Sequence, residues 1–229
     1  MSDLVTYRLS ESVATIAMDD GKVNVISQRM LAELGRAFDR ALEDHAIVIL
    51  TGRPRMFSAG FDLKELTAGG STTRDLLIGG FELAERMLSF PTPVVAACPG
   101  HAIAMGVFLL LSTDYRIGTE GPFKFVANEV AVGFTMPHAA IEVCRHRLAP
   151  AQFQRAMNNA EVFSPDLAVA AGFLDVAVAA DDLERTAVEE ARRLGALNLA
   201  AHQATKLRVR DATLKALRAA IELDDAAFV

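Results

Sequence analysis

The sequence has 229 residues, of which 52% are hydrophobic and 23% charged, and its formal net charge is -6. This length and apolar content suffice for one substantial core, while the acidic balance and the scattered basic residues exclude a nucleic-acid footprint and a polybasic membrane patch. The two cysteines, Cys98 and Cys144, have no metal or CxxC spacing, which favours buried thiols in a reducing compartment and leaves a single disulfide open.

The N-terminal segment MSDLVTYRLS contains neither a basic n-region nor an apolar h-region, so no secretory signal is expected. The longest apolar run, residues 102–111, is shorter than the about 20 residues that a membrane-spanning helix needs. We therefore expect a cytoplasmic protein that binds neither a membrane nor nucleic acid.

The first part of the chain predicts a hairpin, a helix and a buried strand. Alternating apolar residues in LVTYRLS, followed by VATIAM, indicate two paired strands with one half-buried face, and DDGK at 19–22 indicates a turn. From Ser27, a residue type that caps helices, apolar residues recur at helical spacing up to Leu42. The continuous apolar run 46–52 then predicts a strand covered on both faces.

The remaining chain alternates between helical and strand patterns. GGSTT at 69–73 predicts a loop, and a helix is predicted from about Arg74 to Phe90, because Pro91 disfavours helical backbone before it. Strands are predicted at 94–98, 115–118, 123–126 and 174–178, helices at 137–148, 151–158 and 165–171, and mostly helix from residue 183 onwards. This alternation indicates an α/β fold without choosing among the α/β folds.

Small residues join a strand to a short helix in the segment FSAGFDLKEL at 57–66. Ser58, Ala59 and Gly60 stand between the predicted strand and a helix that begins at Asp62. Free N–H groups at such a junction can bind an anion or a polarised carbonyl. A tight turn with an Asp N-cap explains the same residues and is the commoner arrangement.

The segment PGHAIAMGVFLLLSTD at 99–114 repeats this arrangement, with a helix predicted to start near Met105. The first N–H groups of that helix have no intrahelical acceptor, and in an apolar setting they need another partner. A core helix with Gly106 as a packing contact is the alternative. Two such junctions in one domain favour an oxyanion hole, since that kind of site commonly uses two N–H donors.

Glu129 is the only acidic residue between Glu120 and Glu142, and it lies in the apolar segment VANEVAVGF. Desolvation would raise the proton affinity of its carboxylate, which suits a general base. A Glu at a strand edge, paired with Lys or Arg, is the commoner arrangement.

Two other constellations are weaker. A nucleophilic triad would need a Ser, a His and an acid, and the candidates are Ser58, His101 and Asp114, but no GxSxG elbow is present. One predicted helix face carries three metal-ligand residue types, His138, Glu142 and His146, but HExxH is absent, so a solvated polar face is the better interpretation. The C-terminal Lys and Arg residues are expected to be surface charges.

In this order and at these separations, the segments resemble the crotonase superfamily, also called the enoyl-CoA hydratase/isomerase family, over most of the chain. DDGKVNVIS at 19–27 is similar to the early loop that lines the acyl-CoA cleft, and FSAGFDLKEL is similar to the first oxyanion motif. PVVAACPGHAIAMGVFLLLSTDYRI, which includes the characteristic acid at Asp114, resembles the second oxyanion motif. ANEVAVGFTMP resembles the segment that carries a catalytic Glu.

The resemblance implies a fold of ββα turns wound into a superhelix, with a crotonase-like core at residues 1–180 that binds acyl-CoA. It implies a helical C-terminal region at 181–229 that packs between subunits of a homotrimer or of a dimer of trimers. The substrate would be an acyl-CoA thioester of fatty-acid metabolism. No metal and no cofactor beyond the coenzyme A moiety of the substrate are expected.

The resemblance also assigns roles by position in the motifs. The N–H groups of Phe61 and Met105 would form the oxyanion hole, and Glu129 would be the catalytic acid–base. The residues that would border coenzyme A are Ala59, Gly60, Phe61, Asp62, Leu63, Lys64 and Met105, with Lys64 near the phosphates.

One residue departs from the family pattern. Hydratase members usually carry a second glutamate three residues after the position of Met105, and this sequence has Phe108 there. Moving a double bond needs one carboxylate, so the pattern favours a single-Glu isomerase. The alternatives are a hydratase in which His138 or Glu142 replaces the missing acid, and a non-catalytic acyl-CoA-binding subunit.

Overall fold

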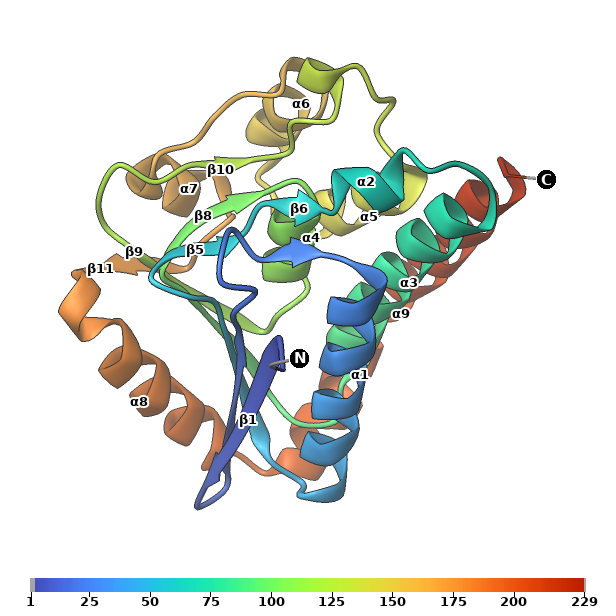
Figure 1. Ribbon diagram of the computed structural model, residues 1–229. Coiled ribbons are helices and arrows are strands. Elements are labelled where there is room, and N and C mark those ends of the chain that lie inside the picture. The colour runs from blue at the N-terminus through green and yellow to red at the C-terminus, as the bar shows by residue number, and fades with distance from the viewer. Residues whose placement is uncertain (1–2, 229) are drawn as a thin grey trace.

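A six-stranded sheet forms the centre of the protein, whose computed structural model describes residues 3–228 (Figure 1). In spatial order its strands are β1 (Val5–Ser10), β2 (Val13–Met18), β4 (Ile47–Thr51), β7 (Val94–Cys98), β9 (Tyr115–Thr119) and β11 (Val176–Val178). β1 and β2 pair as an antiparallel hairpin, and the pairs from β2 to β11 are parallel. The predicted α/β class and N-terminal hairpin are confirmed.

Two smaller parallel sheets lie beyond the central one (Figure 1). One consists of β5 (Arg55–Ser58), β8 (Gly100–Ile103) and β10 (Phe125–Val126), and the other of β3 (Val25–Ile26) and β6 (Gly60–Phe61). The sequence analysis did not predict β3, β6 or β8, since strands of two to four residues are too short to show an alternating pattern.

The chain repeats one order of elements: a strand of the central sheet, a strand of a smaller sheet, and a helix. The repeating units are β2–β3–α1, β4–β5–α3, β7–β8–α4 and β9–β10–α5. Their helices are α1 (Gln28–Glu43), α3 (Gly70–Ser89), α4 (Met105–Leu111) and α5 (His138–Arg147), and the short α2 (Leu63–Leu66) follows β6. This is the predicted ββα superhelix.

Local side-chain chemistry sets the ends of two helices. The Ser27 hydroxyl accepts a hydrogen bond from the Met30 N–H at 3.1 Å, which confirms the predicted N-cap of α1. The loop predicted at 69–73 is wrong, because α3 already begins at Gly70. The Thr73 hydroxyl accepts from the N–H of Gly69 at 2.8 Å and so supports the first turn.

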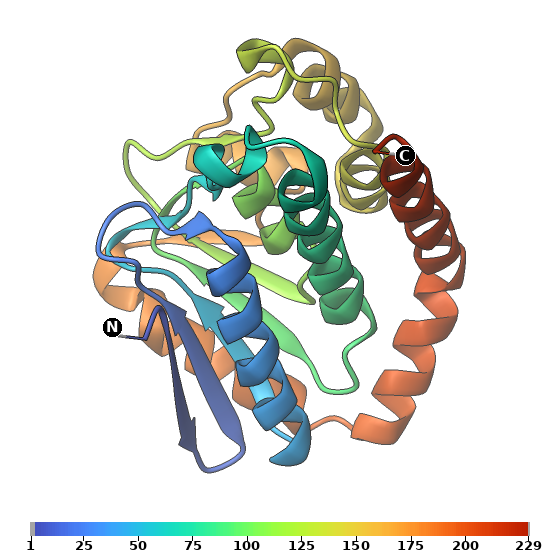
Figure 2. The same ribbon diagram turned by 45° about the vertical axis from the view of Figure 1, so that its right-hand side comes forward.

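β4, in the middle of the central sheet, is buried on both faces, as the apolar run 46–52 predicts, and helices lie on either side of it (Figure 2). Ile47 and Ile49 pack with apolar residues of α8 (Leu183–Gly195), whereas Val48 and Leu50 point into the larger core under α1, α3 and α4. None of these four side chains is more than 3% exposed. The alternation along one strand thus assigns its residues to two separate cores.

The remaining helices complete the C-terminal part. They are η1 (Val130–Val132), α6 (Pro150–Asn159), α7 (Pro165–Ala171), η2 (Ala180–Asp182) and α9 (Leu199–Ala226). α9 runs along the outer side of α3 and α5 (Figure 2). The domain boundary between residues 180 and 181 stays a prediction. Two predictions include residues outside the described part of the chain. The N-terminal segment predicted to lack a secretory signal includes residues 1–2, and the predicted C-terminal helical region includes residue 229.

Between residues 3 and 228, no helix combines the length and the apolar character needed to cross a bilayer.

Candidate functional site

The first junction presents the N–H of Phe61 on the open side of a two-stranded sheet. Ile26 lies opposite Phe61 in the parallel β3–β6 pair, and the N–H of Asp62 donates to the Ile26 carbonyl at 3.0 Å. In a parallel ladder, Ile26 bonds to the residues on either side of Phe61, so the N–H of Phe61 faces away from β3. Among the described strands, β3 is the only neighbour of β6. The Phe61 N–H therefore has no ladder acceptor there.

Gly60 brings this junction against the second one. Its φ of 93° lies in the left-handed region, which glycine adopts without strain. A Cβ at Gly60 would lie 2.7 Å from the Cβ of Ala104 and 3.3 Å from the backbone nitrogen of Met105. Only glycine fits this close approach, and the segments that carry the Phe61 and Met105 N–H groups are direct neighbours.

The second junction orients the N–H of Met105 at the start of α4. Met105 is the first residue of the helix, so its N–H has no intrahelical acceptor. Ala104 precedes it with a φ of 50° and a ψ of -124°, an uncommon conformation for a residue with a Cβ. The Ala104 N–H donates to the Val126 carbonyl at 2.9 Å, and its carbonyl accepts from the Val107 N–H at 2.8 Å. Backbone strain of this kind clusters at functional sites and costs roughly 1–3 kcal/mol.

The side chains of Phe61 and Met105 pack against one small residue of α3. A Cβ at Gly80 would lie 2.6 Å from the Phe61 ring and 3.3 Å from the Cε of Met105. The absence of a side chain at Gly80 lets both residues pack on α3. Both side chains thereby pack against α3.

Glu129 lies between β10 and η1, and among the described residues its carboxylate makes no ion pair. Its Oε2 atom is buried without a hydrogen-bond partner, and no Lys or Arg of residues 3–228 forms an ion pair with it. Desolvation by burial raises the pKa of Glu129 to about 7. The paired strand-edge arrangement considered above is therefore wrong, and the side chain has the properties of a general base.

The segment before Glu129 is joined to the second junction. β10 pairs in parallel with β8, and Val126 lies opposite Ile103. The Val126 carbonyl accepts the hydrogen bond from Ala104, the residue that orients Met105. Three segments far apart in the sequence, around Phe61, Met105 and Glu129, are thus brought to one region of the fold.

An apolar ring occupies the position where the resemblance leads one to expect a second acid. Phe108 is 1% exposed, and its ring centroid lies 5.8 Å from that of Phe81 on α3. The Phe81 centroid in turn lies 6.4 Å from that of Phe61. The rings form a continuous apolar line from the first junction to α4, without a side-chain group that exchanges a proton.

The loop 19–25 is held by two side chains that the sequence analysis did not single out. Asn24 is fully buried with a φ of 53°, and its Nδ2 donates to the carbonyls of Met18 and Phe57. Partial burial acts to raise the pKa of Asp20, but backbone N–H groups, including that of Asn24, outweigh it and hold the pKa below its ordinary value. In the sequence, this role of Asn24 is indicated only by an Asn between two valines shortly after Asp-Asp-Gly.

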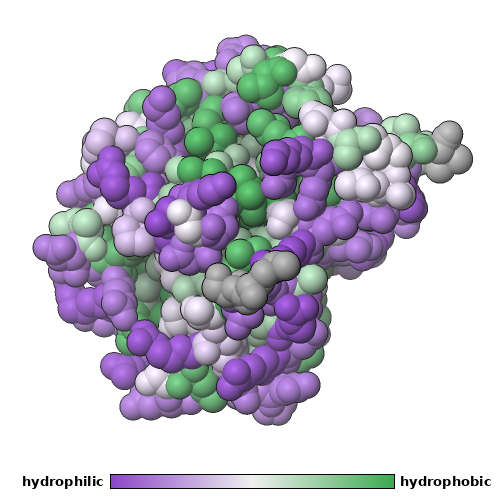
Figure 3. All heavy atoms as spheres, viewed as in Figure 1, coloured by the Kyte–Doolittle hydropathy of each residue, from purple (hydrophilic) through white to green (hydrophobic). Residues whose placement is uncertain are grey.

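The last three residues of the segment predicted to border coenzyme A, residues 62–64, lie at the start of α2. Asp62 caps α2 by accepting the Lys64 N–H at 2.8 Å, and both Leu63 and Lys64 are exposed. Hydrophobic residues also gather beside α2 and β10 on the face shown in Figure 3. Exposed apolar residues of the neighbouring Glu129 loop are Val130, Val132 and Phe134.

The nucleophilic-triad hypothesis fails on geometry. The Ser58 hydroxyl donates to the Asn24 carbonyl at 2.7 Å, and the Nδ1 of His101 accepts from the Lys124 N–H at 3.1 Å. Asp114 is engaged in ion pairs with α9. None of the three contacts another.

The expectation that the C-terminal basic residues are surface charges is wrong for Lys206 and Arg210. Both side chains of α9 are buried, and they pair with Asp114 at 2.6 Å and 2.8 Å, respectively. Lys206 also donates to the Phe90 carbonyl and Arg210 to the Leu88 carbonyl. Both side chains thereby donate hydrogen bonds to carbonyl groups at the C-terminal end of α3, where the helix itself supplies no donor. Their spacing of four residues puts both on one helix face, but it does not identify Asp114 as their partner.

The face of α5 that carries His138, Glu142 and His146 is solvated only in part. His138 is exposed and Glu142 pairs with Arg145 at 3.2 Å, but His146 is half-buried and its Nδ1 lies 3.2 Å from the Thr213 hydroxyl. Burial and neighbouring arginines lower the pKa of His146 to about 4. Over residues 3–228, no group of three or more His, Cys, Asp or Glu side chains is arranged to hold a metal.

Comparison with known proteins gives consistent matches. A family model described as enoyl-CoA hydratase/isomerase matches residues 8–229. An enoyl-CoA hydratase/isomerase family protein from Pseudomonas syringae is 48% identical over 99% of each chain, with a TM-score of 0.97. Human mitochondrial delta3-delta2-enoyl-CoA isomerase is 27% identical over 98% of this chain and 90% of its own, with a TM-score of 0.93. A probable enoyl-CoA hydratase of Bacillus subtilis is 29% identical over 84% of this chain and 74% of its own.

Proposed function

Because the chain belongs to the enoyl-CoA hydratase/isomerase family of acyl-CoA enzymes, we propose that it moves the double bond of an enoyl-CoA thioester with Glu129 as its single proton carrier. The observation that carries the proposal is the carboxylate of Glu129, whose Oε2 is buried without a hydrogen-bond partner and whose pKa is raised to about 7. The likeness to human delta3-delta2-enoyl-CoA isomerase supports the same reaction.

In the proposed mechanism, the thioester oxygen accepts hydrogen bonds from the N–H groups of Phe61 and Met105. The Glu129 carboxylate removes a proton from C2 of a 3-enoyl thioester, and the electron pair moves onto the thioester oxygen to give a dienolate. Glu129 then returns the proton to C4, which leaves the double bond between C2 and C3. Loss of one donor from a hole of this kind costs about 3–4 kcal/mol in transition-state stabilisation.

The surroundings of Phe108 support isomerisation over hydration. Hydration adds water across C2 and C3, and a water molecule must be held and deprotonated while it attacks C3. The benzyl ring of Phe108 can neither accept a proton nor orient water by a strong hydrogen bond. The two other groups considered offer no buried free acid, since His138 is exposed and Glu142 pairs with Arg145.

The proposal is tested with a panel of 2-enoyl-CoA and 3-enoyl-CoA thioesters of different chain lengths. We expect conversion of 3-enoyl to 2-enoyl thioesters and little incorporation of solvent oxygen at C3. Rapid hydration of crotonyl-CoA would favour the hydratase. Binding of the whole panel without turnover would favour a non-catalytic acyl-CoA-binding subunit.

We expect replacement of Lys64 by Ala to weaken acyl-CoA binding roughly two- to five-fold, the range for an exposed ion pair of up to about 1 kcal/mol. Lys64 lies at the start of α2 with its side chain in solvent, as a phosphate contact requires. Calorimetric titration measures the change, and Lys215→Ala on α9 is the matched surface control. Failure of the unmodified protein to bind any CoA thioester would remove the proposal as a whole.

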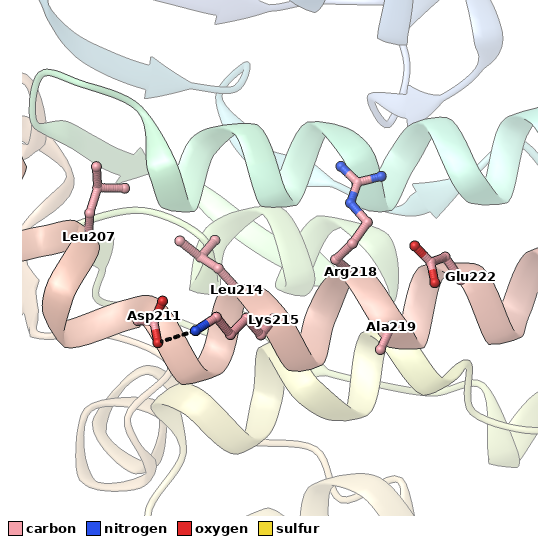
Figure 4. Close-up of a pocket in the computed structure, with 7 residues that line it drawn as sticks. All are labelled: Leu207, Asp211, Leu214, Lys215, Arg218, Ala219 and Glu222. Carbon is pink, nitrogen blue, oxygen red and sulfur yellow. Dashed lines mark hydrogen bonds and ion pairs between the residues drawn. The ribbon is translucent and has the colours of Figure 1, made fainter.

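We also propose a homotrimer or a dimer of trimers, with α9 among the subunit contacts. α9 carries the exposed apolar residues Val209 and Leu223, and a hollow on another side of this helix is lined by Leu207, Leu214 and Ala219 beside charged residues (Figure 4). A subunit contact would cover these apolar side chains. Multi-angle light scattering is expected to give three or six chain masses, and a stable monomer at micromolar concentration would contradict the assembly.

A further inference from the structure

We propose that Asp224 is a positioning residue: from α9 it fixes the loop that carries Glu129. The proposal rests on the function proposed above for Glu129. It extends the site to a residue close to the end of α9, 95 positions further along the sequence.

Asp224 supplies the N-terminal cap of α5. The helix begins at His138, and Pro137 at the N-cap position makes no side-chain cap bond. The two carboxylate oxygens of Asp224 accept the N–H groups of His138 and Ala139, each at 2.9 Å. Asp224 is only 7% exposed. A carboxylate at this place satisfies two otherwise orphan donors and lies at the positive end of the helix dipole.

The capped end of α5 is also the end of the Glu129 loop. The N–H of Phe134 donates to the Glu129 carbonyl at 2.9 Å, so residues 129–134 form one closed turn, and only residues 135–137 separate it from α5. On the other side, the loop is held by the pairing of β10 with β8. The loop is therefore fixed at two ends, by a sheet and by Asp224.

The Glu129 carboxylate depends on this backbone support because its Oε2 has no hydrogen-bond partner. No neighbouring donor holds that oxygen in place, so its position follows from the backbone of the loop and from apolar packing. A displacement of a catalytic group by about 1 Å can cost up to roughly 10²-fold in rate. Loss of the cap should therefore reduce turnover more than substrate binding.

The neighbouring residue Asp225 offers a matched control. It lies in the same turn of α9, but its carboxylate binds Arg74 of α3 in a bidentate ion pair at 2.6 Å and 2.9 Å. Replacing Asp225 by Asn removes a carboxylate and weakens the contact of α9 with α3, and it leaves the cap of α5 intact. Any effect of a generally loosened α9 would appear in both variants.

The first measurement compares steady-state kinetics of Asp224→Asn and Asp225→Asn. Asn has one acceptor oxygen, and its amide group would face the second N–H donor. We expect Asp224→Asn to lower kcat about 10-fold with KM changed less than about two-fold, and Asp225→Asn to keep both within about two-fold. Adding Pro137→Ser to Asp224→Asn supplies a cap from the N-cap position itself and is expected to recover part of the lost kcat.

The second measurement is amide hydrogen exchange, which does not require turnover. Asp224→Asn is expected to speed exchange in residues 129–140, while Asp225→Asn leaves this segment unchanged. If the unmodified protein isomerises no enoyl-CoA, the proposed function fails while the exchange result still tests the support of the loop. Equal kcat losses in the two variants, or unchanged exchange at 129–140 in Asp224→Asn, would overturn the positioning role. If Asp224→Asn does not fold, Asp224→Glu takes its place, because the longer side chain displaces the carboxylate from the two N–H groups. The same changes in kcat and in hydrogen exchange are then expected, and their absence would overturn the proposal in the same way.

Discussion

Replacing Glu129 by Gln is expected to lower kcat for double-bond migration by at least roughly 10²-fold, the low end for loss of a general base. Gln keeps the size of the side chain but cannot remove a proton from C2. The oxyanion donors are backbone N–H groups and remain, so binding of the thioester should change little. Stopped assays with a 3-enoyl-CoA measure the loss, and calorimetry checks that binding persists. Full activity in Glu129→Gln would show that another residue carries the proton.

The pH dependence gives an independent check on the same residue. The base acts when deprotonated, and its pKa is about 7, so kcat/KM of the unmodified protein should rise with pH and level off above about pH 7. Because this pKa is raised, the folded protein keeps the proton of Glu129 up to about pH 7, whereas the unfolded chain releases it near pH 4.5, the ordinary pKa of the side chain. Stability contributed by this proton is present below pH 4.5 and is lost as the pH rises through 7.

It follows that the inactive variant should be the more stable one in alkaline solution. At pH 8, Glu129→Gln no longer buries an unpaired charge, so its free energy of unfolding should exceed that of the unmodified protein by on the order of 2 kcal/mol. At pH 4 the two proteins should differ much less, because Glu129 is then protonated in the folded state and largely protonated in the unfolded state. Urea titrations at both pH values measure this. A variant that is inactive and also less stable at pH 8 would indicate a structural role for Glu129 instead.

Replacing Asp114 by Asn is expected to lower the free energy of unfolding by about 3–5 kcal/mol, as is typical when one partner of a buried ion pair is removed. Asp114 is the carboxylate between Lys206 and Arg210, and all three side chains are less than 10% exposed. Asn leaves two buried cations without their counter-charge. It also leaves the Val94 N–H, which donates to Asp114 Oδ2, with a weaker acceptor.

The control for this prediction is the exposed pair Asp211–Lys215 on the same helix, with side chains 59% and 75% exposed. Asp211→Asn should cost less than about 1 kcal/mol, because water screens the pair. Both variants are compared by the midpoint and slope of urea unfolding. A loss at Asp114 no larger than that at Asp211 would mean that α9 is not anchored through this carboxylate.

Residues close together in the sequence determine the parts of the fold that could be predicted. The Ser27 cap and the helical spacing up to Leu42 define α1, and the uninterrupted apolar run 46–52 defines a strand with two buried faces. The two small-residue junctions and Glu129 were also identified from short segments, since glycine and an isolated acid in apolar surroundings are local signals. The family resemblance then related the three segments to one another.

The features that could not be predicted depend on contacts across the chain. Nothing near Lys206 or Arg210 in the sequence shows that their counter-charge is Asp114, so two exposed helical cations were expected in place of a buried cluster. The role of Asp224 is hidden for the same reason, because the helix it caps begins 86 residues earlier. Glu129 is a different case, because a general base was predicted there, and the alternative of a paired carboxylate was ruled out only by the absence of an ion pair among the described residues.

The contacts of α9 have a consequence for the order in which the protein is made. Asp114 is separated from Lys206 by 92 positions, which takes roughly 5–18 s of synthesis at about 5–20 residues per second. During that interval the ribosome produces β9, β10 and β11, the last strands of the sheets, while the cations that bind Asp114 and the carbonyls at the end of α3 do not yet exist. The ion pairs of Asp114 with Lys206 and Arg210 therefore form only after every strand has been translated, which makes the anchoring of α9 a late step of folding.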